Sequence, residues 1–310
     1  MHLRVKELLM VMRTRRSFLR ECCALSSLAY RAYGQDCMAA DRMRLGNARD
    51  VYPLWPEGSM ASPAYTSRRG RIVRVSAPGL HIIRPEHPNG AAVIIAAGGG
   101  YRHIAVAQEA LPAAHWLASL GITAAILLYR LPDEGGMMEA PLADARRALS
   151  LLQSGLYNER IDAQRVALMG FSAGGHLAGL TALEAHTMPP ALLMLLYPVT
   201  MVGPPFERTR TSRACLGDHS ATREQIMRWS LPPHVGVHAP PLFLAYAADD
   251  SIVSPPQDEY LVQSYQRHHR PYEVHQFATG GHGFGLGRAT GPTQKWPHLA
   301  ERWMRQQGFL

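Results

Sequence analysis

A serine flanked by glycines, where an apolar run meets a run of small residues, constrains the fold most strongly. The segment VALMGFSAGGHLAG covers residues 166–179, with Ser172 near its centre. The apolar residues before Ser172 predict a buried strand, and those after it predict a helix. Gly170 and Gly174 remove side chains that would collide in a sharp turn between the two. The pattern predicts a turn that lifts the Ser172 hydroxyl above a sheet edge; the alternative is an ordinary strand-to-helix turn.

Strand and helix patterns alternate along most of the chain. Strands are predicted at residues 71–76, 79–85, 91–97, 123–129, 165–170, 191–198, 240–247 and 271–277, and helices at 107–121, 140–153, 173–186, 256–269 and 293–306. Short connections between such elements imply a mostly parallel central sheet with helices on both faces. The segment 200–240, rich in Pro and Arg, interrupts the alternation. It is either an insertion that shapes a substrate pocket or a long surface excursion.

Two downstream segments offer the acid and the base that a reactive serine needs. AYAADDSIVSP (245–255) contains Asp249 and Asp250, and ATGGHGFG (278–285) contains His282. Each follows a predicted strand, and in open parallel sheets sites form at the carboxyl ends of the strands. The residues alone leave open which of Asp249 and Asp250 orients His282, and the aspartate that does not would cap the turn. The alternative for His282 is an ordinary loop histidine.

Backbone N–H groups near Ser172 are candidates to bind a developing oxyanion. Ala173 begins the predicted helix, so its N–H faces the same point as the serine. The GGGY segment (98–101) follows an earlier strand, and its Gly98 and Gly99 are the other candidate donors, unless the segment is only a glycine turn. Tyr101 and His103 are candidates to line a substrate pocket. This chemistry requires no cofactor, and the cysteine spacing suits no metal site.

The first 34 residues resemble an export signal. TRRSFLR (14–20) fits the twin-arginine pattern, and AYG (32–34) offers a cleavage site before Gln35. We therefore expect a twin-arginine signal peptide at 1–34, a linker at 35–50 and a catalytic domain at 51–310. The expected partner is the twin-arginine export machinery, and the expected location is periplasmic or secreted. The alternative is a basic amphipathic helix.

Charge and cysteine content fit this division. The net charge is +8, but residues 1–34 hold seven basic and two acidic residues and so carry +5 of it. The remaining +3 is spread over a large domain, which argues against a surface that binds nucleic acid. No apolar run is long enough to span a bilayer as a helix. Cys22 and Cys23 would leave with the signal. Cys37 and Cys215 would remain and could pair in an oxidising compartment.

Five segments together resemble a known family. In chain order they are GGGYRHIAVAQEA, GITAAILLYRLP, RVALMGFSAGGHLAG, PPLFLAYAADDSIVSP and GGHGFG. They are similar to the α/β-hydrolase superfamily, in its acetylxylan-esterase-like branch of secreted bacterial carbohydrate esterases, over roughly residues 52–308. One departure is Ala97, where members usually carry proline or histidine before the glycine triplet.

The resemblance implies an α/β-hydrolase fold and a serine carboxylic-ester hydrolase. It implies Ser172 as nucleophile and His282 as base, and it favours Asp250 as the orienting acid through its distance from Val253. The implied substrate is acetylated xylan or its oligosaccharides, with no cofactor. Two alternatives stay open: a serine peptidase of the prolyl-oligopeptidase type, and a non-catalytic sugar-binding protein on a hydrolase scaffold.

Overall fold

The computed structural model describes residues 45, 51–55, 65–132, 138–155, 160–184, 187–217 and 220–310. The chain divides into two units, Met1–Arg42 and Met43–Leu310, and all described residues belong to the second. The expected signal peptide, nearly all of the expected linker, and Cys37 lie outside these residues. The signal, the linker and the pairing of Cys37 with Cys215 therefore stay predictions.

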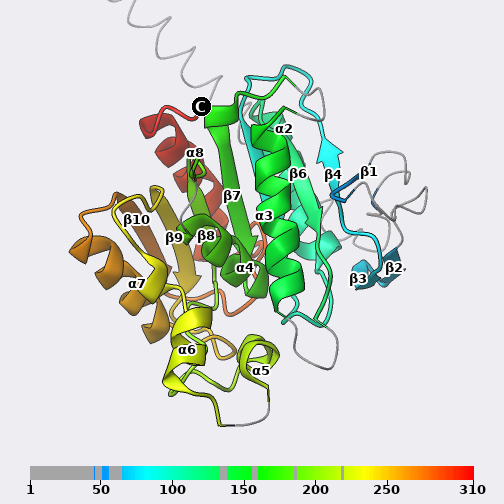
Figure 1. Ribbon diagram of the computed structural model, residues 1–310. Coiled ribbons are helices and arrows are strands. Elements are labelled where there is room, and N and C mark those ends of the chain that lie inside the picture. The colour runs from blue at the N-terminus through cyan, green and yellow to red at the C-terminus, as the bar shows by residue number, and fades with distance from the viewer. Residues whose placement is uncertain are drawn as a thin grey trace, which may run out of the picture. The chain divides into compact units, whose positions relative to one another are not determined.

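One eight-stranded sheet forms the centre of the described unit (Figure 1). Its strands, in spatial order, are β1 (Val51–Pro53), β4 (Gly79–Ile83), β6 (Thr123–Leu128), β5 (Ala92–Ala96), β7 (Val166–Phe171), β8 (Leu193–Leu196), β9 (Leu242–Ala247) and β10 (Tyr272–Phe277). β4 pairs antiparallel with β1 and β6, and all other neighbours are parallel. Every residue of β5 to β9 is buried, as expected for parallel strands covered on both faces.

Helices cover both faces of this sheet. The longer ones are α2 (Leu111–Ser119), α3 (Glu139–Gln153), α4 (Ala173–Leu183), α7 (Pro256–Arg267) and α8 (Trp296–Gln306), and the shorter ones are α5 (Arg210–Leu216) and α6 (Arg223–Trp229). In Figure 1, α3 and α4 lie side by side in front of the sheet. Trp296 of α8 contacts Trp116 of α2 and Phe171 of β7. Neighbouring residues of a strand point to opposite faces of the sheet. Gly170 faces α4, so its neighbour Phe171 faces the other side, where α2 and α8 lie.

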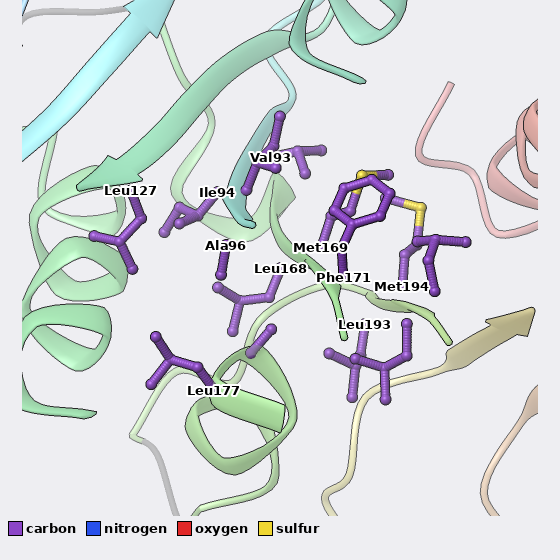
Figure 2. Packing of buried hydrophobic residues seen from close by; sticks show 14 of the residues in the cluster. Val93, Ile94, Ala96, Leu127, Leu168, Met169, Phe171, Leu177, Leu193 and Met194 are labelled. Atoms are coloured by element: carbon purple, nitrogen blue, oxygen red, sulfur yellow. The ribbon is translucent and has the colours of Figure 1, made fainter. Parts of the chain in front are cut away.

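Buried hydrophobic side chains of β5, β7 and β8 pack together in the core (Figure 2). Leu168 of β7 and Leu177 of α4 lie on one face, while Met169 and Phe171 lie on the other. All four are at most 1% exposed. Burying each such side chain contributes roughly 1.5–3 kcal/mol before the entropy of ordering is counted. The strand ends that carry the site therefore stand on a rigid base.

The structure confirms the predicted central strands and their helices to within a few residues at each end. Three features differ. The helix predicted at 107–121 starts as a π-helical turn, Val106–Ala110, and the regular helix begins beside Pro112, whose missing N–H cannot bond to a preceding carbonyl. The strand predicted at 71–76 forms β3 (Arg71–Val75), which pairs with β2 (Tyr65–Arg68) in a separate small sheet. β1 was not expected, because three residues show no periodicity.

The interrupting segment 200–240 contains α5 and α6. It surrounds a surface cavity of about 360 Å³ lined by residues of both helices and their connections, Pro204, Glu207 and Ser212 among them. It also reaches the loop after β5, where a Cβ on Gly100 would lie 2.7 Å from the Cβ of Arg210. None of the helices within the described ranges is long and apolar enough to cross a membrane.

Candidate active site

Ser172 occupies a strained turn between β7 and α4. Its φ of 51° lies in the left-handed region, where residues other than glycine are uncommon. A Cβ on Gly170 would lie 2.3 Å from the carbonyl oxygen of Gly174, and one on Gly174 would lie 2.1 Å from that of Ala96. Both positions therefore require glycine. We call residues 170–174 the serine turn.

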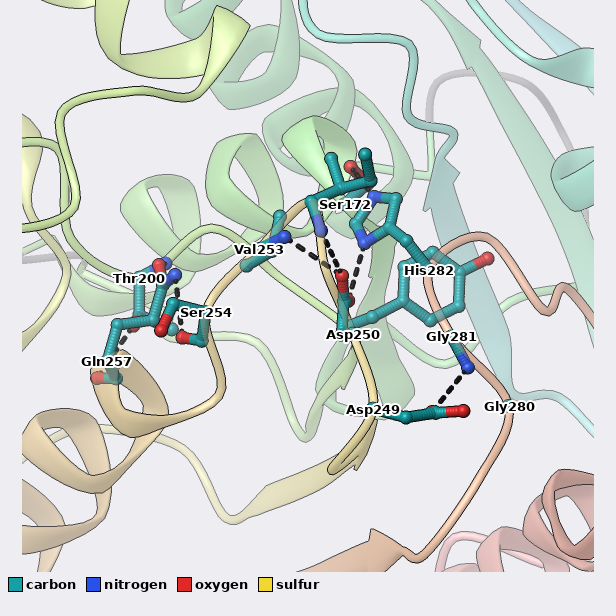
Figure 3. A network of polar contacts seen from close by, with 12 residues as sticks. Ser172, Thr200, Asp249, Asp250, Val253, Ser254, Gln257, Gly280, Gly281 and His282 are labelled. Atoms are coloured by element: carbon teal, nitrogen blue, oxygen red, sulfur yellow. Dashed lines mark hydrogen bonds and ion pairs between the residues drawn. The ribbon is translucent and has the colours of Figure 1, made fainter.

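Three side chains from distant parts of the chain meet at this turn (Figure 3). The Ser172 Oγ lies 2.8 Å from the Nε2 of His282, and the His282 Nδ1 lies 2.7 Å from the Oδ2 of Asp250. A carboxylate can only accept, so Nδ1 carries the proton and Nε2 is free to accept from the serine hydroxyl. This is the relay expected of a nucleophile, a base and an orienting acid.

The structure also separates the two candidate aspartates. The Oδ1 of Asp250 accepts the N–H groups of Ile252 and Val253, each at 2.9 Å, which fixes the carboxylate while Oδ2 faces the imidazole. Asp249 instead accepts the N–H of Gly281 at 2.7 Å, and this bond is the main cause that lowers its pKa. Asp250 therefore contacts His282 directly, whereas Asp249 hydrogen-bonds to the backbone of the preceding residue, Gly281, and also feels the charge of Arg288.

The loop that carries His282 is held by a further residue. We call residues 278–287 the histidine loop. The Arg288 guanidinium donates to the carbonyl oxygens of Gly280 and His282, at 2.6 and 3.3 Å. Sequence reasoning missed Arg288, because an exposed arginine after a glycine-rich loop carries no recognisable signal.

The glycine loop, residues 98–101, differs from expectation at its first residue. The Gly98 N–H already donates to the Oε2 of Glu109 at 2.6 Å, so it is not open to a substrate oxygen. The structure therefore corrects the expectation that Gly98 is an oxyanion donor. Among the described residues, the N–H groups of Gly99 and Ala173 have no hydrogen-bond partner. A Cβ on Gly99 would lie 2.0 Å from the carbonyl oxygen of His103, so this loop also depends on glycine.

Tyr101 does not line an open pocket. Its side chain is 2% exposed, and its hydroxyl bonds to the Nδ1 of His176 at 2.8 Å. The structure therefore corrects the expectation of a pocket-lining role, since the Tyr101 side chain is buried against Tyr129 and His176. His103 is half-buried, and burial lowers its pKa, helped by the positive charges of Arg71 and Arg210. His103 therefore remains a candidate to face substrate.

Two buried residues beside the site were also missed. Glu109 is 6% exposed and accepts hydrogen bonds from Gly98 and from the hydroxyl of Tyr197. The Tyr197 ring lies 5.0 Å from the His282 ring. A lone acid in the apolar segment AQEALPAA was the signal available for Glu109. In the described part of the chain, no three His, Cys, Asp or Glu side chains are grouped so as to hold a metal ion.

Comparisons with known proteins agree with this geometry. A family model described as the alpha/beta hydrolase fold matches residues 93–286. An acetylxylan esterase of Xylanibacter ruminicola is 29% identical over 210 residues, which are 66% of this chain and 43% of that protein. An endo-1,4-beta-xylanase B of Butyrivibrio fibrisolvens is 27% identical over 206 residues, which are 62% of this chain and 32% of that protein. The chain thus spans less than half the length of these two relatives.

Solved structures of esterases also share this fold. An acetyl ester-xyloside bifunctional hydrolase from Caldicellulosiruptor lactoaceticus superimposes with a TM-score of 0.69 and 30% identity, covering 84% of this chain and 97% of that one. An esterase from Thermogutta terrifontis, Est2 with propionate bound, has a TM-score of 0.68 at 22% identity, covering 86% and 97%, and shares the fold. With the eight-stranded sheet and the serine turn, these matches show that the chain belongs to the alpha/beta hydrolase fold family, in its acetylxylan-esterase-like part.

Proposed function

We propose that this protein is a serine carboxylic-ester hydrolase that works through an acyl-enzyme. The observation that carries the proposal is the continuous hydrogen-bond relay from Ser172 through His282 to Asp250. The esterase relatives support the class of reaction. The relay supports the serine mechanism, because an imidazole held by a carboxylate is the base that a hydroxyl needs to become nucleophilic.

In the first half-reaction, the Ser172 Oγ attacks the ester carbonyl carbon, and its proton passes to the His282 Nε2. The carbonyl electrons move to the oxygen, where the N–H groups of Ala173 and Gly99 would donate to the oxyanion. The carbon–oxygen bond to the alcohol then breaks, and the alcohol leaves with the proton from His282. Asp250 keeps the proton on Nδ1 and stabilises the transient imidazolium.

In the second half-reaction, water takes the place of the alcohol. His282 accepts a proton from the water as it attacks the acyl carbon, and the same N–H groups hold the second oxyanion. Collapse returns the proton to Ser172 and releases the carboxylic acid. Removing one such donor typically costs about 2.7–4 kcal/mol of transition-state stabilisation.

We infer acetyl esters of xylan or xylo-oligosaccharides as the substrate. Support comes from the acetylxylan esterase and from the acetyl ester-xyloside hydrolase to which this chain is similar. We also propose that the N-terminal segment directs export by the twin-arginine machinery to the periplasm or beyond. That proposal depends on residues 14–34 of the sequence, and separating cell fractions with and without Arg15→Lys and Arg16→Lys would test it.

An ester panel tests the function. The purified protein is given 4-nitrophenyl acetate, acetylated xylo-oligosaccharides, feruloylated oligosaccharides and longer-chain 4-nitrophenyl esters, and kcat/KM is compared across them. We expect acetyl esters to react fastest, and Ser172→Ala to lower kcat by at least about 10⁴-fold. A Ser172→Ala variant that hydrolyses acetate esters at the wild-type rate would overturn the serine mechanism.

The same panel decides between this proposal and its rivals. A prolyl-peptide amide is added for the peptidase alternative, and xylo-oligosaccharide binding is measured by calorimetry for the sugar-binding alternative. Faster cleavage of the amide than of any ester would favour the peptidase. Sugar binding without hydrolysis, unchanged in Ser172→Ala, would favour the binding protein.

A further inference from the structure

Glu109 is a buried carboxylate that the proposed mechanism does not use. It lies in the π-helical turn Val106–Ala110, before α2, and is 6% exposed. A carboxylate in such a place is costly unless its oxygens are hydrogen-bonded. One oxygen accepts the Gly98 N–H at 2.6 Å, and the other accepts the Tyr197 hydroxyl at 3.1 Å. Glu109 therefore holds the first residue of the glycine loop.

Tyr197 continues the contact to the histidine loop. It follows the last residue of β8, is fully buried, and has a φ of 39°, which is unusual for a tyrosine. Its hydroxyl donates to Glu109 and accepts the Gly285 N–H at 3.0 Å. Its ring packs edge-on against the rings of His282 and Phe284, with centroids 5.0 and 4.4 Å apart. One tyrosine therefore contacts both the imidazole and the backbone of its loop.

The two loops also approach each other directly. Gly285 has a φ of 52°, and a Cβ there would lie 2.6 Å from the carbonyl oxygen of Gln108, the neighbour of Glu109. On the other side, the Gly285 carbonyl accepts the indole N–H of Trp296 at 2.9 Å. Gly285 is therefore fixed from two directions, and its distance from Glu109 is set by packed contacts.

We propose that Glu109 and Tyr197 form a positioning bridge for the reaction proposed above. The bridge runs from Gly98 through Glu109 and Tyr197 to Gly285, and it fixes the glycine loop and the histidine loop relative to each other. The proposal rests on the proposed function, because acyl transfer needs the imidazole and the oxyanion donors to act on one carbonyl group. Displacements of about 1 Å in such arrangements cost about 100-fold in rate.

The hydrogen-bond pattern of Glu109 adds an electrostatic role. When the carboxylate is ionised, both of its oxygens accept, one from the Gly98 N–H and one from the Tyr197 hydroxyl, which itself accepts from Gly285. Burial raises the pKa of Glu109, and the bonds from Gly98 and Tyr197, together with the charge that His282 carries once protonated, offset only part of that rise. The attraction is mutual, so an ionised Glu109 favours the imidazolium that forms when His282 takes the serine proton.

A double-mutant cycle tests the bridge. Tyr197→Phe, Glu109→Gln and the double variant are compared with wild type for kcat and KM on 4-nitrophenyl acetate, with urea unfolding to establish the folded fraction. We expect each single change to lower kcat by about 10- to 100-fold with KM changed by less than about 3-fold, because positioning acts on the transition state. The double variant should be no slower than the slower single variant, since the two residues act as one unit.

Tyr265→Phe is the matched control. Tyr265 is also fully buried, and its hydroxyl donates to the Pro240 carbonyl at 3.1 Å, in a contact that involves neither loop. It should lose comparable stability and keep kcat within about 2-fold of wild type. If Tyr197→Phe fails to fold, the isosteric Glu109→Gln decides alone.

The bridge is overturned if Tyr197→Phe or Glu109→Gln retains the wild-type kcat, or if the two effects multiply. Its failure can be told apart from failure of the proposed function. An inactive wild type, or a Ser172→Ala variant as fast as wild type, rejects the ester hydrolase itself. An active wild type whose bridge variants are equally active rejects only the bridge.

Discussion

The serine turn and the histidine loop are held in place by different kinds of contact. The serine turn depends on close backbone approaches within a short stretch of chain and its neighbouring strand. Any side chain at Gly170 or Gly174 would collide with a carbonyl group. The position of Ser172 is therefore set by steric exclusion, which the local sequence encodes.

The histidine loop depends on polar contacts with residues outside it, among them Asp249 and Tyr197, which are distant in the sequence. Asp249 accepts from Gly281, Arg288 donates to Gly280 and His282, and Tyr197 accepts from Gly285. Each of these bonds is individually modest, and removal of one leaves the others in place. A change in the serine turn therefore threatens the fold, whereas a change around the histidine loop lowers the catalytic rate first.

The largest effect is expected from Gly174→Ala. Its new Cβ would lie 2.1 Å from the carbonyl oxygen of Ala96, and neither the buried start of α4 nor the buried strand β5 can move freely. We expect the free energy of unfolding to fall by about 4 kcal/mol or more, measured by urea denaturation. Gly236→Ala, where nothing lies within 4 Å of the new Cβ, should stay near wild type. A stable and active Gly174→Ala variant would show that steric exclusion does not set the position of Ser172.

The next largest effect is expected from Asp250→Asn, which should lower the rate of ester hydrolysis and leave the stability of the fold unchanged. An asparagine can still accept the turn N–H groups, but its amide would face the His282 Nδ1 and favour the wrong tautomer. The kcat on 4-nitrophenyl acetate should fall by roughly 10⁴-fold with the fold retained. Asp249→Asn is the matched comparison, and it should cost less than about 10-fold, since Asp249 bonds to the Gly281 N–H and not to His282. Equal losses in the two variants would contradict the assignment of Asp250.

At His176, behind the serine turn, we expect an effect of intermediate size, in which the free energy of unfolding depends on pH. His176 is fully buried, its Nε2 lies 2.6 Å from the Trp229 carbonyl oxygen, and burial lowers its pKa from 6.5 to about 4. The imidazole of His176 binds a proton more readily in the unfolded chain than in the folded one. Its contribution to the free energy of unfolding is therefore complete above about pH 6.5 and is lost as the pH falls toward 4. The loss should be on the order of 3 kcal/mol in the free energy of unfolding.

Urea unfolding at a series of pH values measures this effect. The His176→Gln variant should be less stable at pH 7 and should show a shallower decline between pH 6.5 and 4. His268→Gln, on the exposed end of α7, should decline like wild type. An unchanged slope in His176→Gln would show that the acid sensitivity lies elsewhere.

The smallest effect is expected from Arg288→Leu in the histidine loop. Two of its hydrogen bonds reach the loop backbone, but the side chain is exposed and the other contacts remain. We expect kcat to fall by about 3- to 10-fold with a change in unfolding free energy below about 1 kcal/mol. Arg305→Leu, which removes an exposed ion pair with Glu301, should leave kcat unchanged. Equal kcat values for Arg288→Leu and Arg305→Leu would show that Arg288 does not help to position the histidine loop.

The same comparison explains what the sequence could predict. The central strands, the helices and the serine turn follow from local patterns, because glycine spacing and apolar periodicity act over a few residues. The choice of Asp250 over Asp249 depended on a resemblance, because only the fold shows which carboxylate points at His282. The engagement of Gly98 by Glu109 was not predictable, because it joins a loop to a side chain buried by tertiary packing. Tyr101 and Arg288 were misjudged or missed for the same reason.

Covalent labelling shows directly whether Ser172 is the nucleophile. The purified protein is treated with a 4-nitrophenyl alkylphosphonate, digested, and analysed by mass spectrometry. We expect one adduct, on the peptide that contains Ser172, with complete loss of ester hydrolysis and with labelling slowed by about 10³-fold or more in His282→Ala. An adduct on another residue with Ser172 unmodified, or full hydrolysis after Ser172 is labelled, would contradict it.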